Sequence, residues 1–151
     1  MNAEATVRRV AGHAPVSARI YLLLFPIPVV CFLGALATDV VYASSAYLMW
    51  LHFSEWLIAA GLAFGALAAL ALLVEFFGSR TMRRGASGWV HLLLFYAALV
   101  VELLNSLVHT IDGWTAVVPN GMAASVVGAV LALGAVATLS RVAGVPWEAR
   151  S

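Results

Sequence analysis

Four long apolar stretches, separated by short polar segments, dominate the chain. They cover approximately residues 19–42, 49–77, 88–111 and 118–140. Each could cross the roughly 30 Å hydrocarbon core of a bilayer as a helix, because a helix rises about 1.5 Å per residue. The pattern predicts an all-α fold, an integral membrane four-helix bundle over residues 19–144, with tails at 1–18 and 145–151.

The composition agrees with a membrane protein. Hydrophobic residues make up 64% of the chain and charged residues 10%, whereas about 25% of the residues in a soluble domain are charged. The formal net charge is +1, so no basic surface is available to neutralise phosphates. We therefore expect the lipid bilayer as the surroundings of the chain and no nucleic-acid partner.

The positions of the basic residues predict how the bundle is oriented. All eight are arginines, and they lie in the N-terminal tail and the start of the first stretch, in the loop at 78–88, and in the C-terminal region. The loops near 43–48 and 112–121 contain no basic residue. Because cytoplasmic loops are enriched in arginine and lysine, we expect both termini to be cytoplasmic.

The third stretch contains polar residues at membrane depth. Glu102, Asn105 and His109 are spaced by three, four and seven residues, which places them on one face of a helix. An ionisable side chain at the centre of a bilayer costs about 3 kcal/mol on insertion scales. This face should therefore point into the bundle and find polar partners there.

Further polar residues are expected near the same outer end of the bundle. Asp39 lies close to the end of the first stretch, and His52 and Glu55 lie near the start of the second. With Glu102, Asn105 and His109 they form a predicted polar pocket, and Asp112 follows just beyond it.

Small residues in the second and fourth stretches indicate where helices approach each other. Gly61 and Gly65 are four residues apart, and so are Ala124 and Gly128. In membranes such spacings allow close helix contact, so we interpret these four residues as helix-packing positions.

Several motifs together resemble a known family. They are F-P-I near the start of the first stretch, C-F-L-G-A-L-A-T-D-V-V-Y (31–42), W-L-H-F-S-E-W-L-I-A-A-G-L (50–62), W-V-H (89–91), N-S-L-V-H-T-I-D-G-W (105–114) and V-P-N-G (118–121). The chain resembles the four-helix bacterial membrane proteins of the domain of unknown function family 2231, which implies a multi-pass protein of the bacterial inner membrane. The family has no assigned activity, but its domain is similar to ones fused to Rieske-type iron–sulfur domains or encoded beside quinoprotein sugar-aldehyde dehydrogenases. These fusions and neighbouring genes imply a role in respiratory redox chemistry.

The polar residues allow several kinds of site. His52 and His109 could ligate a haem b iron between adjacent helices, and His13 and His91 form a weaker pair at the inner side. The pocket could instead hydrogen-bond a quinone and pass its protons outward. A third alternative is a divalent metal held by Asp39, His52, Glu55 and His109. The same residues could also serve only to fix the helix register.

The sequence reveals no catalytic activity. The preferred function is an accessory membrane subunit or anchor for a respiratory or periplasmic redox protein, with a quinone or haem site near the outer face. One alternative is a small transporter or channel in which Glu102 is the coupling group. Another is a purely structural helix bundle or homo-oligomer.

Overall fold

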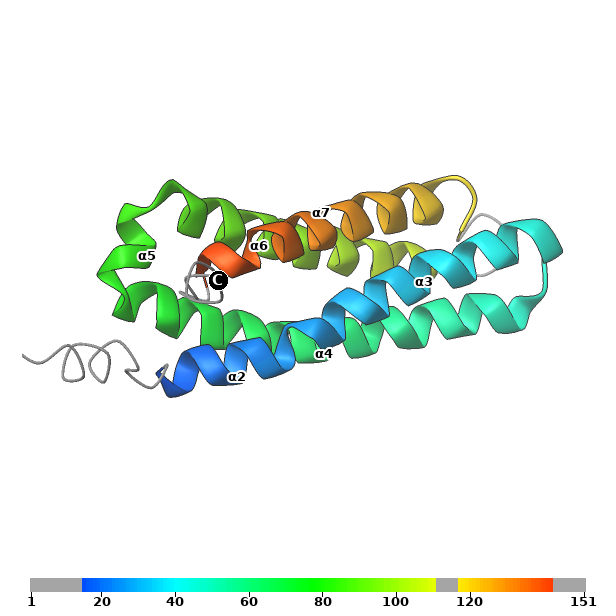
Figure 1. Ribbon diagram of the computed structural model, residues 1–151. Coiled ribbons are helices and arrows are strands. Elements are labelled where there is room, and N and C mark those ends of the chain that lie inside the picture. The colour runs from blue at the N-terminus through cyan, green and yellow to red at the C-terminus, as the bar shows by residue number, and fades with distance from the viewer. Residues whose placement is uncertain (1–14, 111–116, 143–151) are drawn as a thin grey trace, which may run out of the picture.

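The computed structural model describes residues 15–110 and 117–142, which form four long helical rods lying side by side (Figure 1). The first rod consists of α2 (Val16–Leu24) and α3 (Pro26–Ser45), and the second is α4 (Leu48–Gly78). The short helix α5 (Arg80–Arg84) leads to the third rod, α6 (Ala86–His109), and the fourth is α7 (Asn120–Val142). All four rods are long and apolar enough to cross a membrane. The predicted all-α, four-span fold is confirmed.

Two prolines explain why the first rod is divided. Pro26 and Pro28 lack the backbone N–H that would bond to the preceding turn, although Phe25 between the two helices keeps right-handed helical backbone angles. The first helix ends at Leu24 and the next begins at Pro26, where a missing donor does no harm. The Phe25 N–H still bonds to the Tyr21 carbonyl at 2.8 Å, so α3 continues the path of α2 (Figure 1).

The rods form a closed ring in the order α3, α4, α6, α7. The most extensive packing is between α6 and α7 and between α3 and α4, and the pairs α3–α7 and α4–α6 complete the ring. We call the end with the turn between α3 and α4 the Ala46 end, and the end with the short connecting helix the α5 end (Figure 1). The last turn of α6 and the first turn of α7 also lie at the Ala46 end.

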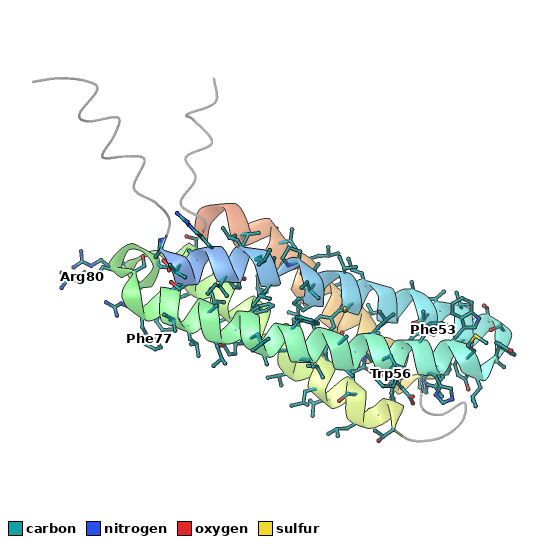
Figure 2. All side chains as sticks on the ribbon, turned by 90° about the horizontal axis from the view of Figure 1, so that it is seen from below. Phe53, Trp56, Phe77 and Arg80 are labelled. Carbon is teal, nitrogen blue, oxygen red and sulfur yellow. The ribbon has the colours of Figure 1, made fainter. Side chains whose placement is uncertain are left out.

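The outside of the bundle is apolar, as lipid contact requires. Large apolar side chains are exposed along every rod, and Figure 2 shows Phe53 and Trp56 near the Ala46 end and Phe77 near the α5 end. The core of the α5 half is largely aromatic, with Tyr21, Phe25, Phe32, Phe76 and Phe95 packed against alanines. Because both surface and core are apolar, the buried polar residues stand out as candidates for function.

Two of the predicted packing glycines lie where helices come close. A Cβ on Gly61 would lie 2.5 Å from the ring of Phe32 in α3, and a Cβ on Gly65 would lie 2.5 Å from a methyl of Leu99 in α6. Both glycines therefore make room for a large side chain of a neighbouring helix. Ala124 is half-buried on α7, and Gly128, one turn further along, faces a polar side chain.

Candidate functional site

Asp39 is the centre of a buried polar cluster in the Ala46 half of the bundle. Its Oδ1 accepts a hydrogen bond from Ser54 of α4 at 2.5 Å and shares a hydrogen with Nε2 of His109 of α6 at 3.0 Å. Its Oδ2 accepts a hydrogen bond from Ser125 of α7 at 2.5 Å. One carboxyl group on α3 thus binds all three other rods. We call the following residues the Asp39 cluster: Asp39, Ser54, Glu102, Asn105, His109 and Ser125.

The polar face of α6 supplies half of this cluster. Glu102, Asn105 and His109 all face the bundle interior, as their spacing predicts, and the most exposed of them, His109, is 1% accessible. The Asn105 amide nitrogen donates to Oε2 of Glu102 at 3.0 Å and to the Ser125 hydroxyl at 2.8 Å. A continuous chain of hydrogen bonds therefore runs from Glu102 through Asn105 and Ser125 to Asp39.

The contacts of His109 determine how many protons it shares with Asp39. Its Nδ1 lies 3.0 Å from the backbone carbonyl of Asn105, and a carbonyl can only accept, so Nδ1 carries a hydrogen. One further proton must lie between Nε2 and the Asp39 carboxyl, because that 3.0 Å contact needs a donor. The pair is an imidazolium with a carboxylate or an imidazole with a carboxylic acid, and its sum of charges is zero in both forms. Proton movement within it leaves its net charge unchanged.

Glu102 lies at the deep end of the cluster and is incompletely bonded. Its Oε1 and the Oδ1 of Asn105 are buried and have no hydrogen-bond partner in the described part of the chain. The carboxyl group packs directly against Gly128 of α7, where any Cβ would collide with Oε1. The glycine therefore provides the space in which the Glu102 carboxyl lies.

His52 and Glu55 were predicted to join this pocket, but they lie outside it. They pair with each other at 3.1 Å on the surface, with side-chain exposures of 57% and 35%. The buried face of α4 follows Leu51, Ser54 and Ile58. His52 and Glu55 each lie one residue beyond a buried position, which turns a side chain by about 100° around the helix. The structure brings Asp39, Glu102, Asn105 and His109 together and leaves these two apart.

This arrangement does not fit a haem held by His52 and His109. Both ring nitrogens of His109 are engaged, one with a carbonyl and one with a carboxyl, whereas a ligand to iron needs a free nitrogen lone pair. His52 is exposed and bonded to Glu55. The predicted metal set of Asp39, His52, Glu55 and His109 is also not assembled: within residues 15–110 and 117–142, no three His, Cys, Asp or Glu side chains are grouped to hold a metal ion.

Sequence reasoning missed the two serines of the cluster. Ser54 and Ser125 are uncharged and occur in apolar stretches, so a search for ionisable residues passes over them. A helical pattern could have found them, because Ser54 follows the buried spacing of α4 and Ser125 lies three residues before Gly128 on α7. The predicted neighbour Asp112 lies outside the described residues.

A second buried polar group lies in the α5 half. Nδ1 of His91 contacts the Ala135 carbonyl at 3.0 Å and the Thr138 hydroxyl at 2.8 Å. Nδ1 therefore carries the hydrogen, and Nε2 accepts a hydrogen bond from the Tyr21 hydroxyl at 2.5 Å. The rings of Phe25 and Phe95 surround the pair. Both ring nitrogens are satisfied, so a free haem ligand is absent here too, and the suggested partner His13 lies outside the described residues.

We expect Tyr21→Phe to lower the free energy of unfolding by about 1–2 kcal/mol, because it leaves Nε2 of His91 buried without a donor. Chemical or thermal unfolding of the detergent-solubilised protein measures the effect. The matched control is Tyr47→Phe, which removes a hydroxyl from a residue that is 57% exposed. Equal stability of the two variants would contradict the assigned hydrogen bond.

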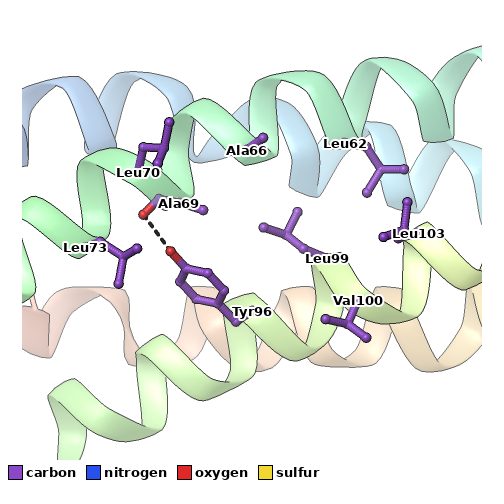
Figure 3. A pocket seen from close by; sticks show the side chains of 9 residues that line it. All are labelled: Leu62, Ala66, Ala69, Leu70, Leu73, Tyr96, Leu99, Val100 and Leu103. Atoms are coloured by element: carbon purple, nitrogen blue, oxygen red, sulfur yellow. Dashed lines mark hydrogen bonds between the residues drawn. The ribbon is translucent and has the colours of Figure 1, made fainter.

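A groove between α4 and α6 opens toward the lipid (Figure 3). It has a volume of about 510 Å³ and is lined by Leu62, Ala66, Ala69, Leu70, Leu73, Tyr96, Leu99, Val100 and Leu103. The Tyr96 hydroxyl donates its hydrogen to the Ala69 carbonyl at 2.9 Å. None of these nine side chains therefore has a free donor for a quinone carbonyl.

A family model described as a predicted membrane protein, DUF2231, matches residues 20–143. The chain belongs to this family. No curated protein and no solved structure matches the chain. DUF2231 membership agrees with the four membrane-spanning rods, and the description of the family states no activity.

Proposed function

We propose that this DUF2231 protein is an accessory subunit of a respiratory or periplasmic redox system in the bacterial inner membrane, and that its Asp39 cluster accepts and returns a proton. The observation that carries the proposal is the buried Asp39–His109 contact, which holds one transferable proton between two ionisable groups. Such pairs inside a membrane domain are typical of proton relays. The redox part of the proposal follows from the fused redox domains and neighbouring dehydrogenase genes that the family resemblance implies.

Proton exchange fits this cluster better than direct binding of a quinone. The hydroxyls of Ser54 and Ser125, both amide hydrogens of Asn105 and the His109 ring are all engaged within the cluster. A quinone carbonyl would have to displace one of these bonds. A proton needs no such space, because it can move along hydrogen bonds that already exist.

The proposal includes an orientation. Arg19, Arg80, Arg83 and Arg84 lie on α2 and α5, at the α5 end of the bundle. The positive-inside rule favours a cytoplasmic α5 end, cytoplasmic termini and a cluster near the outer face. A reporter that is active only in the periplasm, fused after Ser151, should stay inactive; activity would contradict this orientation.

Transport across the whole membrane is less well supported. Between His91 and Glu102, the buried positions of α6 are Phe95 and Ala98, and Ala132 and Ala135 are the buried alanines in the same part of α7. This apolar layer separates the Asp39 cluster from the Tyr21–His91 pair. A coupling role for Glu102 in transport would need a polar path through the layer.

The experiment isolates the protein with its bound partner from membranes in mild detergent. We expect the complex to show a dithionite-reducible cofactor and to take up protons on reduction, as read by a pH indicator. Asp39→Asn should keep the partner but lose most of the proton uptake that passes through the cluster to the partner, because an asparagine amide can hydrogen-bond neutral His109 without exchanging a proton.

The matched control is Ser106→Ala, whose hydroxyl bonds to the Leu103 carbonyl outside the cluster. It should behave as wild type. A complex without any redox cofactor, or unchanged proton uptake in Asp39→Asn, would refute the proposed function. A monodisperse self-assembly as the sole isolated species would favour the structural homo-oligomer instead.

A further inference from the structure

Glu102 lies in a part of the cluster where the charges do not balance. The Asp39–His109 pair is neutral in both of its forms, so an ionised Glu102 would leave one uncompensated negative charge. The buried face of α4 has no ionisable residue, and residues 120–139 of α7 contain none either. Among the described residues, the buried carboxyl and imidazole groups of the cluster beside Glu102 are Asp39 on α3 and His109 on its own helix. A buried unpaired carboxylate costs several kcal/mol.

The two unpartnered atoms indicate what is missing. Oε1 of Glu102 and Oδ1 of Asn105 are both buried acceptors without a donor, and leaving a buried acceptor unsatisfied costs about 1–3 kcal/mol. Both belong to side chains that already share the bond from the Asn105 amide nitrogen to Oε2 of Glu102. Both amide hydrogens of Asn105 are used. No described residue donates to either atom, so a further hydrogen is needed to satisfy them.

We propose that Glu102 and Asn105, with Gly128 as the wall of the site, bind one exchangeable proton that is held on Oε1 of Glu102. The proton cancels the excess charge and turns Oε1 from an unpartnered acceptor into a donor. Gly128 matters because a Cβ would occupy the position of Oε1.

A metal ion is a poorer occupant of this site. Divalent cations of the hard type take about six or more oxygen ligands, and here two acceptor atoms are free. No group of three His, Cys, Asp or Glu side chains is arranged for a metal among the described residues. A sodium ion would supply the same single positive charge, so the experiment must distinguish it from a proton.

This proton site extends the proposed function. Only the role of the bound proton rests on that function, whereas the site itself is inferred from the contacts of Glu102 and Asn105. A proton that moves between Asp39 and His109, or that enters the pair and leaves it again, does not change the charge of the cluster at rest. Uptake or release at Glu102 changes that charge by one. The cluster would then hold protons at two positions. The proton shared by Asp39 and His109 leaves the net charge unchanged, whereas the proton on Glu102 changes the electric field at His109.

Infrared spectroscopy of the isolated protein, with the side-chain carboxyl of glutamate labelled by ¹³C, tests the site without a partner or ligand. We expect a protonated-carboxyl C=O band at neutral pH that shifts with the label, which separates it from Asp39. The band should be the same in sodium-free buffer and in sodium chloride, and it should convert reversibly to a carboxylate band at high pH.

Glu102→Gln should abolish the labelled band while keeping wild-type stability, because glutamine has the shape and charge of a protonated glutamate. Glu75→Gln, at a partly exposed residue bonded to Ser17, is the control that should retain the band. If Glu102→Gln does not fold, the band is assigned with the other two variants. Loss of the band in Glu55→Gln or Glu75→Gln would assign it to that residue and overturn the proposal. Retention of the band in both variants supports Glu102.

Two results on the wild-type protein would overturn the proposal. One is a labelled carboxylate band alone at neutral pH. The other is a protonated band that disappears when sodium is added, which would identify an alkali-cation site. Either result leaves the proton exchange of Asp39 and His109 untouched, since that is measured separately in the partner complex. Conversely, failure of the partner experiment leaves the infrared result standing.

Discussion

Asp39→Ala is expected to lower the free energy of unfolding by about 3–5 kcal/mol, the range measured when one member of a buried ion pair is removed. The substitution removes the carboxyl group that is hydrogen-bonded to Ser54, His109 and Ser125. Nε2 of His109 and two hydroxyls would then be buried in the bundle with no carboxyl to receive them. Because each donor comes from a different helix, the loss weakens the contacts of all four rods.

Unfolding in mixed detergent micelles, followed by circular dichroism, measures this effect. Asp39→Asn is the matched variant and should be clearly less destabilised, because its amide can donate to neutral His109 and its oxygen can still accept from a serine. Ser44→Ala, at an exposed serine that bonds to the Val41 carbonyl, should be close to wild type. If Asp39→Ala were as stable as Ser44→Ala, Asp39 would not be the centre of the cluster.

Gly128→Ala is expected to destabilise the protein by about 3 kcal/mol, near the upper end of the usual range for overpacking. The added methyl would occupy the position of Oε1 of Glu102. The carboxyl cannot move away freely, because Asn105 holds its other oxygen and is itself bonded to Ser125. The clash should therefore outweigh the gain of up to about 1 kcal/mol in helix propensity that alanine offers over glycine.

Gly134→Ala is the matched control on the same helix. Its Cβ would lie 3.4 Å from a methyl of Leu94, which is an ordinary contact with a flexible side chain, so the stability should be unchanged or slightly higher. The double variant Gly128→Ala with Glu102→Ala should be less destabilised than the sum of the single variants, because removing the carboxyl makes room for the methyl. Strict additivity would show that the two residues do not compete for the same space.

The local pattern of the sequence was sufficient to predict the four rods and the polar face of α6. Hydropathy and length identify a membrane span without knowledge of its neighbours. The spacing of Glu102, Asn105 and His109 also predicts that they share a face. The cost of ionisable groups in lipid requires that this face point inward, and all three are buried.

The sequence could not determine how each rod is rotated about its own axis. His52 and Glu55 were expected in the pocket because they lie at the right height, yet the buried face of α4 passes through Ser54, between them in the sequence. Near the Ala46 end, water or lipid head groups can solvate a surface pair such as His52–Glu55. The free-energy cost of leaving ionisable side chains on the outside of the bundle is therefore lower there than at the depth of Glu102.

The sequence by itself therefore determined the spans, their number and the polar face of one helix, because these follow from periodicity and from the cost of burying charge. Tertiary structure decided the centre of the cluster: Asp39 at the meeting point of four helices, the serines that bond to it, and Gly128 against Glu102. It also decided the Tyr21–His91 pair, whose members are 70 residues apart in the chain. These contacts depend on which helix faces lie opposite each other, and packing between helices fixes that choice.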